Sequence, residues 1–416
     1  MQKTISRTRV TRPNRAMLLA IASIALAGAT GCGLGGRWGW HKPYGSKEIR
    51  AVWVTRWDFK NPSDIACVME NCRRAGFNTV LFQVRGAGTA LYRSRLEPWA
   101  DELGGRDPGF DPLAIACVEG HRRGLAVHAW VNVIPGWYGD KPPANPKQLY
   151  HARANWFWRD ASGQRQPLGW YSSVNPCYPE VRKYLCAVMR EIVDKYPVDG
   201  LHMDYIRYPN EHSKAYEGRG AVPDYPRDPR TLAMFKQETG KTPDQAPQLW
   251  SRWRADQLTQ LVRDIRAVTL RARRGAVLSA AVGPSPDEHL RNHFQDTRRW
   301  IAEELVDAVF PMNYAQDMAT FDKRLTAWSK ADVPVVTGVM FDKRDDALVA
   351  QQIEHAGRSG RHYCAFAYNS LFERRDASGR PIMDGQSASR TGLRNRVIPQ
   401  VRGASVQAAR SGPWSR

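Results

Sequence analysis

Cysteine is scarce in this sequence, and several familiar functional signals are missing. Seven cysteines occur among 416 residues, and their spacing fits neither a CxxC motif nor a Cys/His zinc site. The net charge is +20, yet no zinc finger, basic helix or aromatic RNA-binding signature accompanies it. The sequence also lacks a His/Asp cluster with the spacing of a metal centre. We therefore expect no metal, no other cofactor and no nucleic-acid partner.

The apolar run near the N-terminus is too short to cross a bilayer. It covers 17–29, whereas a spanning helix needs about 20 residues. An acid-free basic segment precedes it, which is typical of a secretory signal. Ala29-Thr30-Gly31 before Cys32 resembles a bacterial lipobox, although Leu is usual at the position of Ala29. We predict a lipoprotein signal peptide over 1–31 and lipidation of Cys32, with ordinary signal cleavage as the alternative.

This N-terminus also predicts where the protein is found and how the chain is divided. A lipid on Cys32 would anchor it to a membrane of the cell envelope, and Gly33 in place of Asp resembles an outer-membrane address in a Gram-negative host. We expect a linker over 32–46 and one folded domain over 47–375. Residues 376–416 form a basic extension rich in Ser, Gly and Arg, which we expect to be partly disordered after about Arg402.

Short runs rich in β-branched and aromatic residues recur along the chain, each followed by a helix-like stretch. The eight predicted strands are 50–56, 79–85, 126–133, 200–205, 277–283, 306–313, 335–340 and 364–369. The first two start 29 residues apart, and the last four repeat the same interval. This period favours a closed (β/α)8 TIM barrel. A doubly wound sheet is the alternative, but a glycine-rich phosphate loop is missing after the first run.

Longer intervals predict long insertions in the loops after the second, third and fourth strands. Loops that follow barrel strands build the active-site face, so such insertions enlarge the site. The insertion over 134–178 is rich in aromatic residues, among them Trp137, Tyr138, Trp156, Trp158, Trp170 and Tyr171. We interpret them as a platform that stacks on sugar rings, with Trp137 and Trp170 as substrate contacts. The alternative is that the loop packs a small core of its own.

Polar side chains cluster where the predicted strands end. In a TIM barrel, a charge directly after an apolar strand is typical of a catalytic residue. Asp204, at the end of the fourth strand, is the clearest candidate. The other strand ends supply candidate substrate-binding residues: Asp58, Arg85, Asn132, Tyr205, Arg207, Asn313, Tyr314 and Asn369. His128 and His202 lie within strands, where we expect buried hydrogen-bonding groups rather than bases.

Five segments, in order, resemble the bacterial glycosyl-hydrolase-like family 10 domain. They are 50–55, 78–85, 128–132, 175–182 and 199–209, and the resemblance covers roughly 47–371. It implies a TIM barrel with glycosidase-type activity, directed in some relatives at peptidoglycan glycan strands. The catalytic carboxylate of the family maps onto Asp204. Trp130 and Asn175 lie in these segments and join the candidates for substrate binding.

Glycoside hydrolysis normally uses two carboxyl groups, about 5 Å apart for retention and roughly 6.5–9.5 Å apart for inversion. Asp317 and Asp342 are the best-placed partners for Asp204, with Asp58 behind them, although each could instead cap a helix. A looser likeness to family 18 chitinases departs at the acid, because Ile206 and Arg207 stand where its glutamate should be.

The sequence therefore predicts a glycosidase that cleaves an envelope or extracellular polysaccharide, with peptidoglycan glycan strands as the leading substrate. We expect it to act as a monomer. A barrel that binds glycans without cleaving them and an envelope scaffold are the alternatives.

Overall fold

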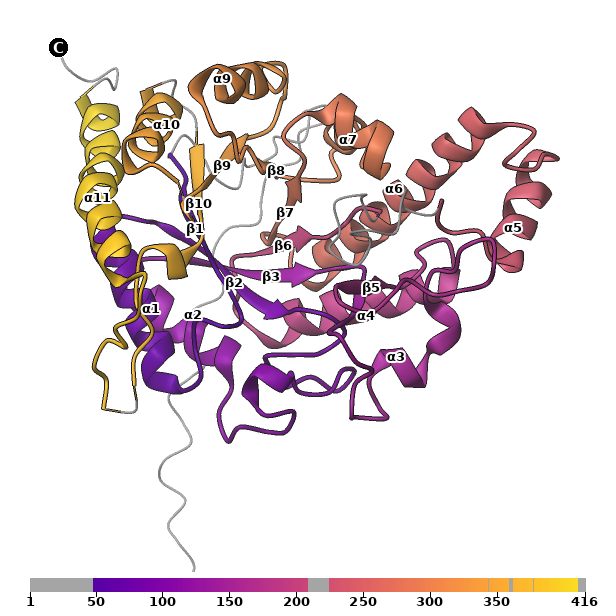
Figure 1. The fold of residues 1–416 in the computed structure, drawn as a ribbon, viewed down its shortest axis with the longest axis horizontal. Coiled ribbons are helices and arrows are strands. Elements are labelled where there is room, and N and C mark those ends of the chain that lie inside the picture. The colour runs from indigo at the N-terminus through magenta and orange to yellow at the C-terminus, as the bar shows by residue number, and fades with distance from the viewer. Residues whose placement is uncertain (1–47, 209–223, 343, 359–361, 377, 411–416) are drawn as a thin grey trace, which may run out of the picture. The chain divides into compact units, whose positions relative to one another are not determined.

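Eight parallel strands alternate with helices in the part of the chain that the structure describes (Figure 1). This computed structural model describes residues 48–208, 224–342, 344–358, 362–376 and 378–410, all within one compact unit, Lys42–Arg416. The predicted signal peptide, Cys32 and the linker therefore lie outside the described residues. The parallel strands are β1 (Arg50–Val54), β2 (Thr79–Arg85), β3 (Ala126–Asn132), β6 (Gly200–Asp204), β7 (Val277–Val282), β8 (Ala308–Pro311), β9 (Val336–Met340) and β10 (His362–Phe366).

The strands form a nearly closed barrel. Their order is β8-β7-β6-β3-β2-β1-β10-β9, and every ladder between neighbours is parallel. Two parallel bridges, Val309 to Val335 and Met312 to Gly338, join the outer strands β8 and β9. The predicted (β/α)8 barrel is therefore confirmed, and all eight predicted strands are present.

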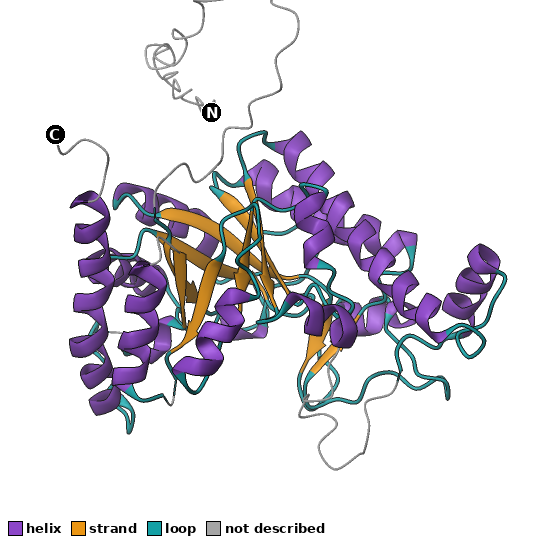
Figure 2. Cartoon of the chain, turned by 90° about the horizontal axis from the view of Figure 1, so that it is seen from above, coloured by secondary structure: helices purple, strands orange, loops and turns teal. Residues whose placement is uncertain are grey.

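Helices surround the strands on the outside, as Figure 2 shows. They are α1 (Pro62–Ala75), α2 (Pro112–Arg122), α4 (Pro179–Lys195), α6 (Pro247–Ala272), α8 (Thr297–Ala302), α9 (Met318–Thr326), α10 (Asp346–Arg358) and α11 (Ser387–Arg410). Local sequence fixes their ends. Asn61 accepts a hydrogen bond from the backbone N–H of Asp64, and Gly76 ends α1 with a φ of 97°. Among the described helices, none is long and apolar enough to span a membrane.

The long loops carry small elements of their own. The loop after β2 contains η1 (Asp101–Leu103). The loop after β3 holds the antiparallel pair β4 (Pro135–Tyr138) and β5 (Tyr171–Ser173), with α3 (Leu149–Ala152) and η2 (Ala154–Trp156) between them. The loop after β6 contains α5 (Pro229–Thr239), the loop after β7 contains α7 (Pro286–His293), and η4 (Tyr368–Ser370) follows β10. The insertions after the second and third barrel strands thus lie on the face where the strands end.

The C-terminal region differs from our expectation of an extension that begins at 376. Helix α11 lies beside α10 and α1 (Figure 1) and occupies the place of the eighth barrel helix. Leu393, Val397 and Val401 are buried on one of its faces, and the hydroxyl group of Tyr363 on β10 donates to the carbonyl oxygen of Val401. A four-residue spacing puts these apolar side chains on one helix face, so α11 packs on the barrel over the part that contains Leu393, Val397 and Val401.

Aromatic rings fill the inside of the barrel. The Trp53 indole N–H donates to Nε2 of His202 at 3.1 Å, and Nδ1 of His202 lies 2.9 Å from Oγ of Ser279. Burial holds the pKa of His202 well below its ordinary value, so the ring is neutral. At the start of β6, Gly200 allows close approach of the neighbouring strand β7, because a Cβ there would lie 2.6 Å from the carbonyl oxygen of Val277. His202 is a buried hydrogen-bonding group, as the sequence predicted.

Candidate functional site

Asp204 is the last residue of β6 and lies at the C-terminal mouth of the barrel. The residue is 6% exposed. Oδ1 accepts hydrogen bonds from the backbone N–H of Tyr205 at 2.6 Å and from Nη1 of Arg207 at 2.9 Å. Among the described residues, none donates a hydrogen bond to Oδ2. One carboxylate oxygen is thus fixed in place, while the other is available to a ligand.

The turn after Asp204 is held in an unusual conformation. Tyr205 has a φ of 49°, in the left-handed region that non-glycine residues rarely adopt. Its ring lies under the guanidinium of Arg207, with Cζ 4.2 Å from the ring centroid. Such strain is concentrated at functional sites, where the surrounding structure maintains it. Here the turn places both the N–H of Tyr205 and Arg207 against the same carboxylate oxygen.

Two side chains on the neighbouring strand β3 share the inward face with Asp204. Asn132 is level with Asp204 in the ladder, and Trp130 lies one layer below, level with His202. Both are buried, and Oδ1 of Asn132 and Nε1 of Trp130 make no hydrogen bond with any described residue. Buried polar atoms normally have partners. These two atoms therefore offer an acceptor and a donor to a polar ligand at the mouth.

Tyr171 connects this group to the end of β1. Its hydroxyl oxygen accepts hydrogen bonds from Nη1 of Arg56 at 3.1 Å and from Nδ2 of Asn132 at 3.3 Å. Burial, and to a smaller extent the charge of Asp204, raise the pKa of Tyr171. Because both contacts use lone pairs, the hydroxyl hydrogen of Tyr171 is directed toward other acceptors. Our sequence analysis did not assign Arg56 to the site, although it ends the first predicted strand.

A series of aromatic rings extends from Tyr205 across the mouth. Ring centroids are 4.6 Å apart for Tyr205 and Tyr171, 4.9 Å for Tyr171 and Tyr138, and 6.4 Å for Tyr138 and Trp57. Trp170 packs on Tyr138, and Trp57 is 42% exposed. Flat, partly exposed rings of this kind stack on apolar faces of ligands. Trp57 is a member that the sequence analysis missed, although it directly follows Arg56.

Other aromatic residues of the same insertion form a core instead of a platform. Trp137 is buried, and its indole N–H donates to the carbonyl oxygen of Lys141 at 2.9 Å. Trp158 has no exposed surface and stacks on Tyr208 at 4.8 Å. The insertion therefore contains a small core of its own and also presents partly exposed rings at the mouth. Trp170 remains at the partly exposed surface, whereas Trp137, which we had predicted to contact substrate, is buried in this core.

Three further residues that we predicted to bind substrate make hydrogen bonds within the fold. Arg85 is fully buried, where it forms a two-pronged ion pair with Glu97 and donates to the carbonyl oxygens of Asn132, Val133 and Pro135. Asn175 donates to Oγ1 of Thr231 at 2.8 Å and so joins its loop to the start of α5. Asn313 donates to the carbonyl oxygen of Phe321 on α9 at 3.0 Å. Their polar side chains hold neighbouring loops and helices in place, and Oδ1 of Asn313 makes no hydrogen bond with any described residue.

Tyr314, in contrast, lies near Asp204. Its ring packs on Phe366 at 5.5 Å. Burial first, and then the charge of Asp204, raise the pKa of Tyr314 well above its ordinary value. The structure therefore brings together Asp204, Tyr205, Arg207, Asn132, Trp130 and Tyr314 from the predicted set.

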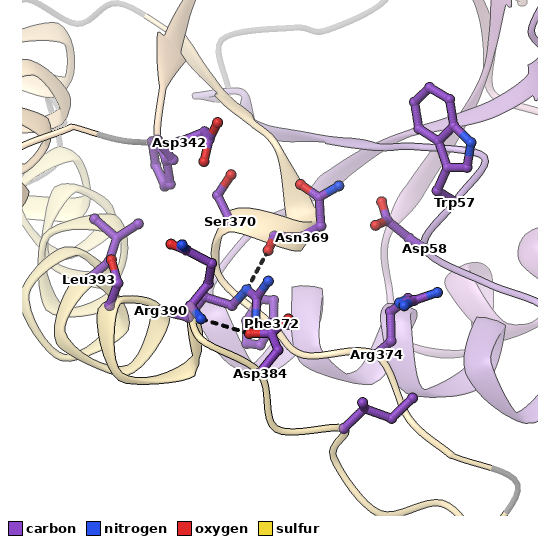
Figure 3. A pocket seen from close by; sticks show the side chains of 14 residues that line it. Trp57, Asp58, Asp342, Asn369, Ser370, Phe372, Arg374, Asp384, Arg390 and Leu393 are labelled. Carbon is purple, nitrogen blue, oxygen red and sulfur yellow. Dashed lines mark hydrogen bonds and ion pairs between the residues drawn. The ribbon is translucent and has the colours of Figure 1, made fainter. Parts of the chain in front are cut away.

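The carboxyl groups proposed as partners lie elsewhere. Asp317 is exposed and caps α9, because it accepts hydrogen bonds from the N–H and hydroxyl groups of Thr320 at 2.7 and 2.9 Å. These bonds lower the pKa of Asp317, which is the opposite of what a general acid needs. The structure thus shows a helix-capping role for Asp317, which we had predicted as a candidate acid. Asp342 is exposed and lines, with Asp58 and Asn369, a cavity whose walls do not include Asp204 (Figure 3).

We also looked for side chains that could hold a metal ion. In the described ranges, no group of three His, Cys, Asp or Glu side chains is arranged to hold a metal ion.

Comparison with known proteins decides the family. Residues 48–354 match the Glycosyl hydrolase-like 10 family. The chain belongs to this family. Family membership and the hydrolase relatives bear out the predicted class of enzyme, a glycosidase.

Among related sequences, the chain is similar to Glycosyl hydrolase DigH of Escherichia coli strain K12. The two are 26% identical over 353 residues, which cover 72% of this chain and 74% of DigH. It is also similar to Glycosyl hydrolase YngK of Bacillus subtilis strain 168, with 27% identity over 317 residues that cover 68% of this chain and 58% of YngK.

Solved structures share the barrel. The glycoside hydrolase domain of PgaB (BpsB) from Bordetella bronchiseptica superposes with a TM-score of 0.61 at 14% identity, covering 84% of this chain and 99% of that domain. The catalytic domain of a β-amylase from Paenibacillus polymyxa superposes with a TM-score of 0.57 at 13% identity, covering 85% and 98%. At these identities the likeness supports the fold alone.

Proposed function

We propose that this member of the Glycosyl hydrolase-like 10 family cleaves a polysaccharide with Asp204 as its principal catalytic carboxylate. The proposal rests on the hydrogen bonding of this carboxylate. Oδ1 accepts hydrogen bonds from Tyr205 and Arg207, whereas Oδ2 accepts none from the described residues. An ionised carboxylate in this position serves as nucleophile or base toward a sugar. Arg207 forms an ion pair with this carboxylate and so supplies its counter-charge.

The surroundings of Asp204 suit a sugar chain. Trp130 and Asn132 present an unpaired donor and acceptor, and Tyr171 has a hydroxyl hydrogen to donate. The rings of Tyr138, Trp170 and Trp57 supply stacking surfaces along the mouth. A ligand with many hydroxyl groups and apolar ring faces can satisfy both kinds of surface.

We further propose that the substrate is a polymer of the cell envelope, with peptidoglycan glycan strands as the first candidate. This rests on the family resemblance and on the predicted lipoprotein signal, with Cys32 as the lipidated residue. Fractionation of cells that express the wild type and Cys32→Ser tests the anchor. We expect the wild type in the membrane fraction and the variant released from it; a wild type found in the soluble fraction would contradict the anchor.

The activity itself is tested by incubating the purified mature chain with a panel of glycans. The panel contains peptidoglycan with and without its stem peptides, chitin, β-glucans and galactosaminoglycans, and the released ends are measured as reducing sugar. We expect cleavage of peptidoglycan glycan strands. Binding without release of reducing ends from any polymer would instead favour the second candidate, a glycan-binding barrel. That candidate is kept because Asp317 caps a helix and Asp342 lines a cavity whose walls do not include Asp204.

A further inference from the structure

The cavity lined by Asp58, Asp342 and Asn369 opens on the same face of the barrel as Asp204, between the ends of β1, β9 and β10 and the start of α11 (Figure 3). Its volume is about 390 Å³, which is within the range of small-molecule sites. Trp57 and Asp58 contribute one wall and Asp342 another. The remainder comes from the chain between Asn369 and Leu393.

That remaining wall lies beyond the segment that matches the family, which ends at residue 354. It is nevertheless well fixed. Arg390 on α11 donates from Nε to the carbonyl oxygen of Asn369 at 2.8 Å and from Nη1 to Oδ1 of Asp384 at 2.7 Å. The N–H of Ile382 donates to the carbonyl oxygen of Arg374 at 2.8 Å. The cavity is therefore a feature of this chain that family membership does not imply.

Arg374 supplies an unneutralised positive charge to this cavity. Its side chain is exposed, and its guanidinium forms no ion pair or hydrogen bond with any residue that the structure describes. It lies near Asp58, whose pKa burial raises to about 7, with the charge of Arg374 opposing the rise. The other arginine of the cavity, Arg390, is already paired with Asp384.

The remaining groups suit a sugar ring. Figure 3 shows Arg374 and Asp58 on one side of Asn369 and Asp342 on the other. The exposed Asn369 offers amide donors and an acceptor, and Asp342 offers acceptors. Trp57, which is 42% exposed, also begins the series of rings that leads through Tyr138 to the Asp204 site. The cavity and the proposed catalytic site thus share one continuous lining.

We propose that this cavity is a glycan subsite that holds a sugar unit bearing a carboxylate, at a distance from the bond cleaved at Asp204. Arg374 binds the carboxylate, Asn369 and Asp342 bind hydroxyl groups, and Trp57 stacks on the ring. Arginine suits this task because its planar guanidinium pairs with a carboxylate through two parallel hydrogen bonds. The inference rests on the proposed function, because it takes the ligand to be another unit of the same polymer.

The test combines a change in the protein with a change in the ligand. Glycan chains of peptidoglycan freed of stem peptides carry a carboxylate on every second sugar, and chemical reduction converts these groups to alcohols. Dissociation constants for both forms are measured with the full chain carrying Asp204→Asn, which prevents turnover, with and without Arg374→Ala. Arg380→Ala is the matched control, because Arg380 is exposed on the same segment and does not line the cavity.

We expect Arg374→Ala to weaken binding of the carboxylate form by about tenfold or more, as for loss of a charged hydrogen bond. Binding of the reduced form should hardly change, and Arg380→Ala should affect neither form. An equal effect of Arg374→Ala on the two forms, or none on either, overturns the subsite.

Hydrolysis is assayed separately with the chain that retains Asp204. This separates the test of the subsite from the test of the proposed function. Cleavage of the carboxylate form without any dependence of binding on Arg374 refutes the subsite alone. If glycan binding depends on Arg374 but the chain with Asp204 intact cleaves no glycan, the subsite is upheld and the catalytic role of the barrel is refuted.

Discussion

Arg207 reaches back three residues along the chain and donates a 2.9 Å hydrogen bond to Oδ1 of Asp204. The guanidinium is itself held against the ring of Tyr205, which lies between the two residues in the sequence. A single tight turn after β6 therefore orients the carboxylate and supplies its counter-charge. The opposite oxygen accepts no hydrogen bond from the described residues, and the ring of Tyr205 begins the series of aromatic rings across the mouth.

Two tryptophans of the insertion after β3 should respond in opposite ways to truncation. Trp158→Ala removes a fully buried ring that stacks on Tyr208 and should destabilise the fold by about 3–5 kcal/mol. Trp170→Ala removes a partly exposed ring beside Tyr138 and should weaken glycan binding by about tenfold with little change in stability. Urea denaturation and glycan titration of both variants check this. A Trp170→Ala protein with wild-type affinity would remove this ring from the platform.

Breaking the Arg85 and Glu97 pair should destabilise the barrel without a specific effect on catalysis. Both side chains are fully buried, and removal of one partner leaves an uncompensated buried charge, at a cost of about 3–5 kcal/mol. Arg85→Met should therefore lower the denaturation midpoint strongly. Arg298→Met, which breaks the exposed pair with Asp287, is the control and should have little effect. Equal stability of the two variants would contradict the framework role of Arg85.

Asp317 should behave as a helix cap. Asp317→Asn keeps an oxygen that can accept from the N–H of Thr320, whereas Asp317→Ala loses it. We expect a small drop in melting temperature for Asp317→Ala, a smaller one for Asp317→Asn, and unchanged turnover for both. Loss of turnover in Asp317→Asn at unchanged stability would restore it as a candidate acid.

Asp58 should make stability depend on pH. Burial raises the pKa of Asp58 in the folded state to about 7, from a model-peptide value of 3.8. Between these values the folded state holds more protons than the unfolded state, so this residue's contribution to stability falls as pH rises from about 4 to about 7. Asp58→Asn lacks this titration. The stability of the wild type relative to Asp58→Asn should fall by a few kcal/mol over that range, since one pKa unit corresponds to about 1.4 kcal/mol. Parallel stability curves for the two proteins would show that Asp58 has an ordinary pKa.

The sequence predicted the barrel well because its signals are local. Apolar strands, a repeated βα interval, and caps such as Asn61 and Gly76 each mark an element without knowledge of the rest of the chain. Helix α11 was harder to recognise. Its buried positions Leu393, Val397 and Val401 are spaced as in a helix, but Gly, Ser and Arg around them gave the composition of a disordered tail.

The site was predicted less completely, because one residue type after a strand serves several purposes. Asp204 and Asp317 both follow strands, yet one ends a strand at the barrel mouth and the other caps an exposed helix. Arg56 and Arg85 each end a predicted strand. The structure shows that Arg56 donates to Tyr171 at the mouth, whereas Arg85 is enclosed by Glu97 and the loop after β3. Direction and burial of a side chain depend on the tertiary structure, which spacing along the chain does not encode.

We propose Asp204 as the catalytic carboxylate of glycan hydrolysis, and the hydrolysis rate of Asp204→Asn is the sharpest test of that role. The substitution keeps the shape and an oxygen that can accept from Tyr205 and Arg207 but removes the negative charge. Glycan binding should therefore survive. We predict that the rate of reducing-end release from the substrate falls at least about a hundredfold, the scale of general acid–base catalysis. Hydrolysis by Asp204→Asn at the wild-type rate would show that the Asp204 carboxylate is not catalytic.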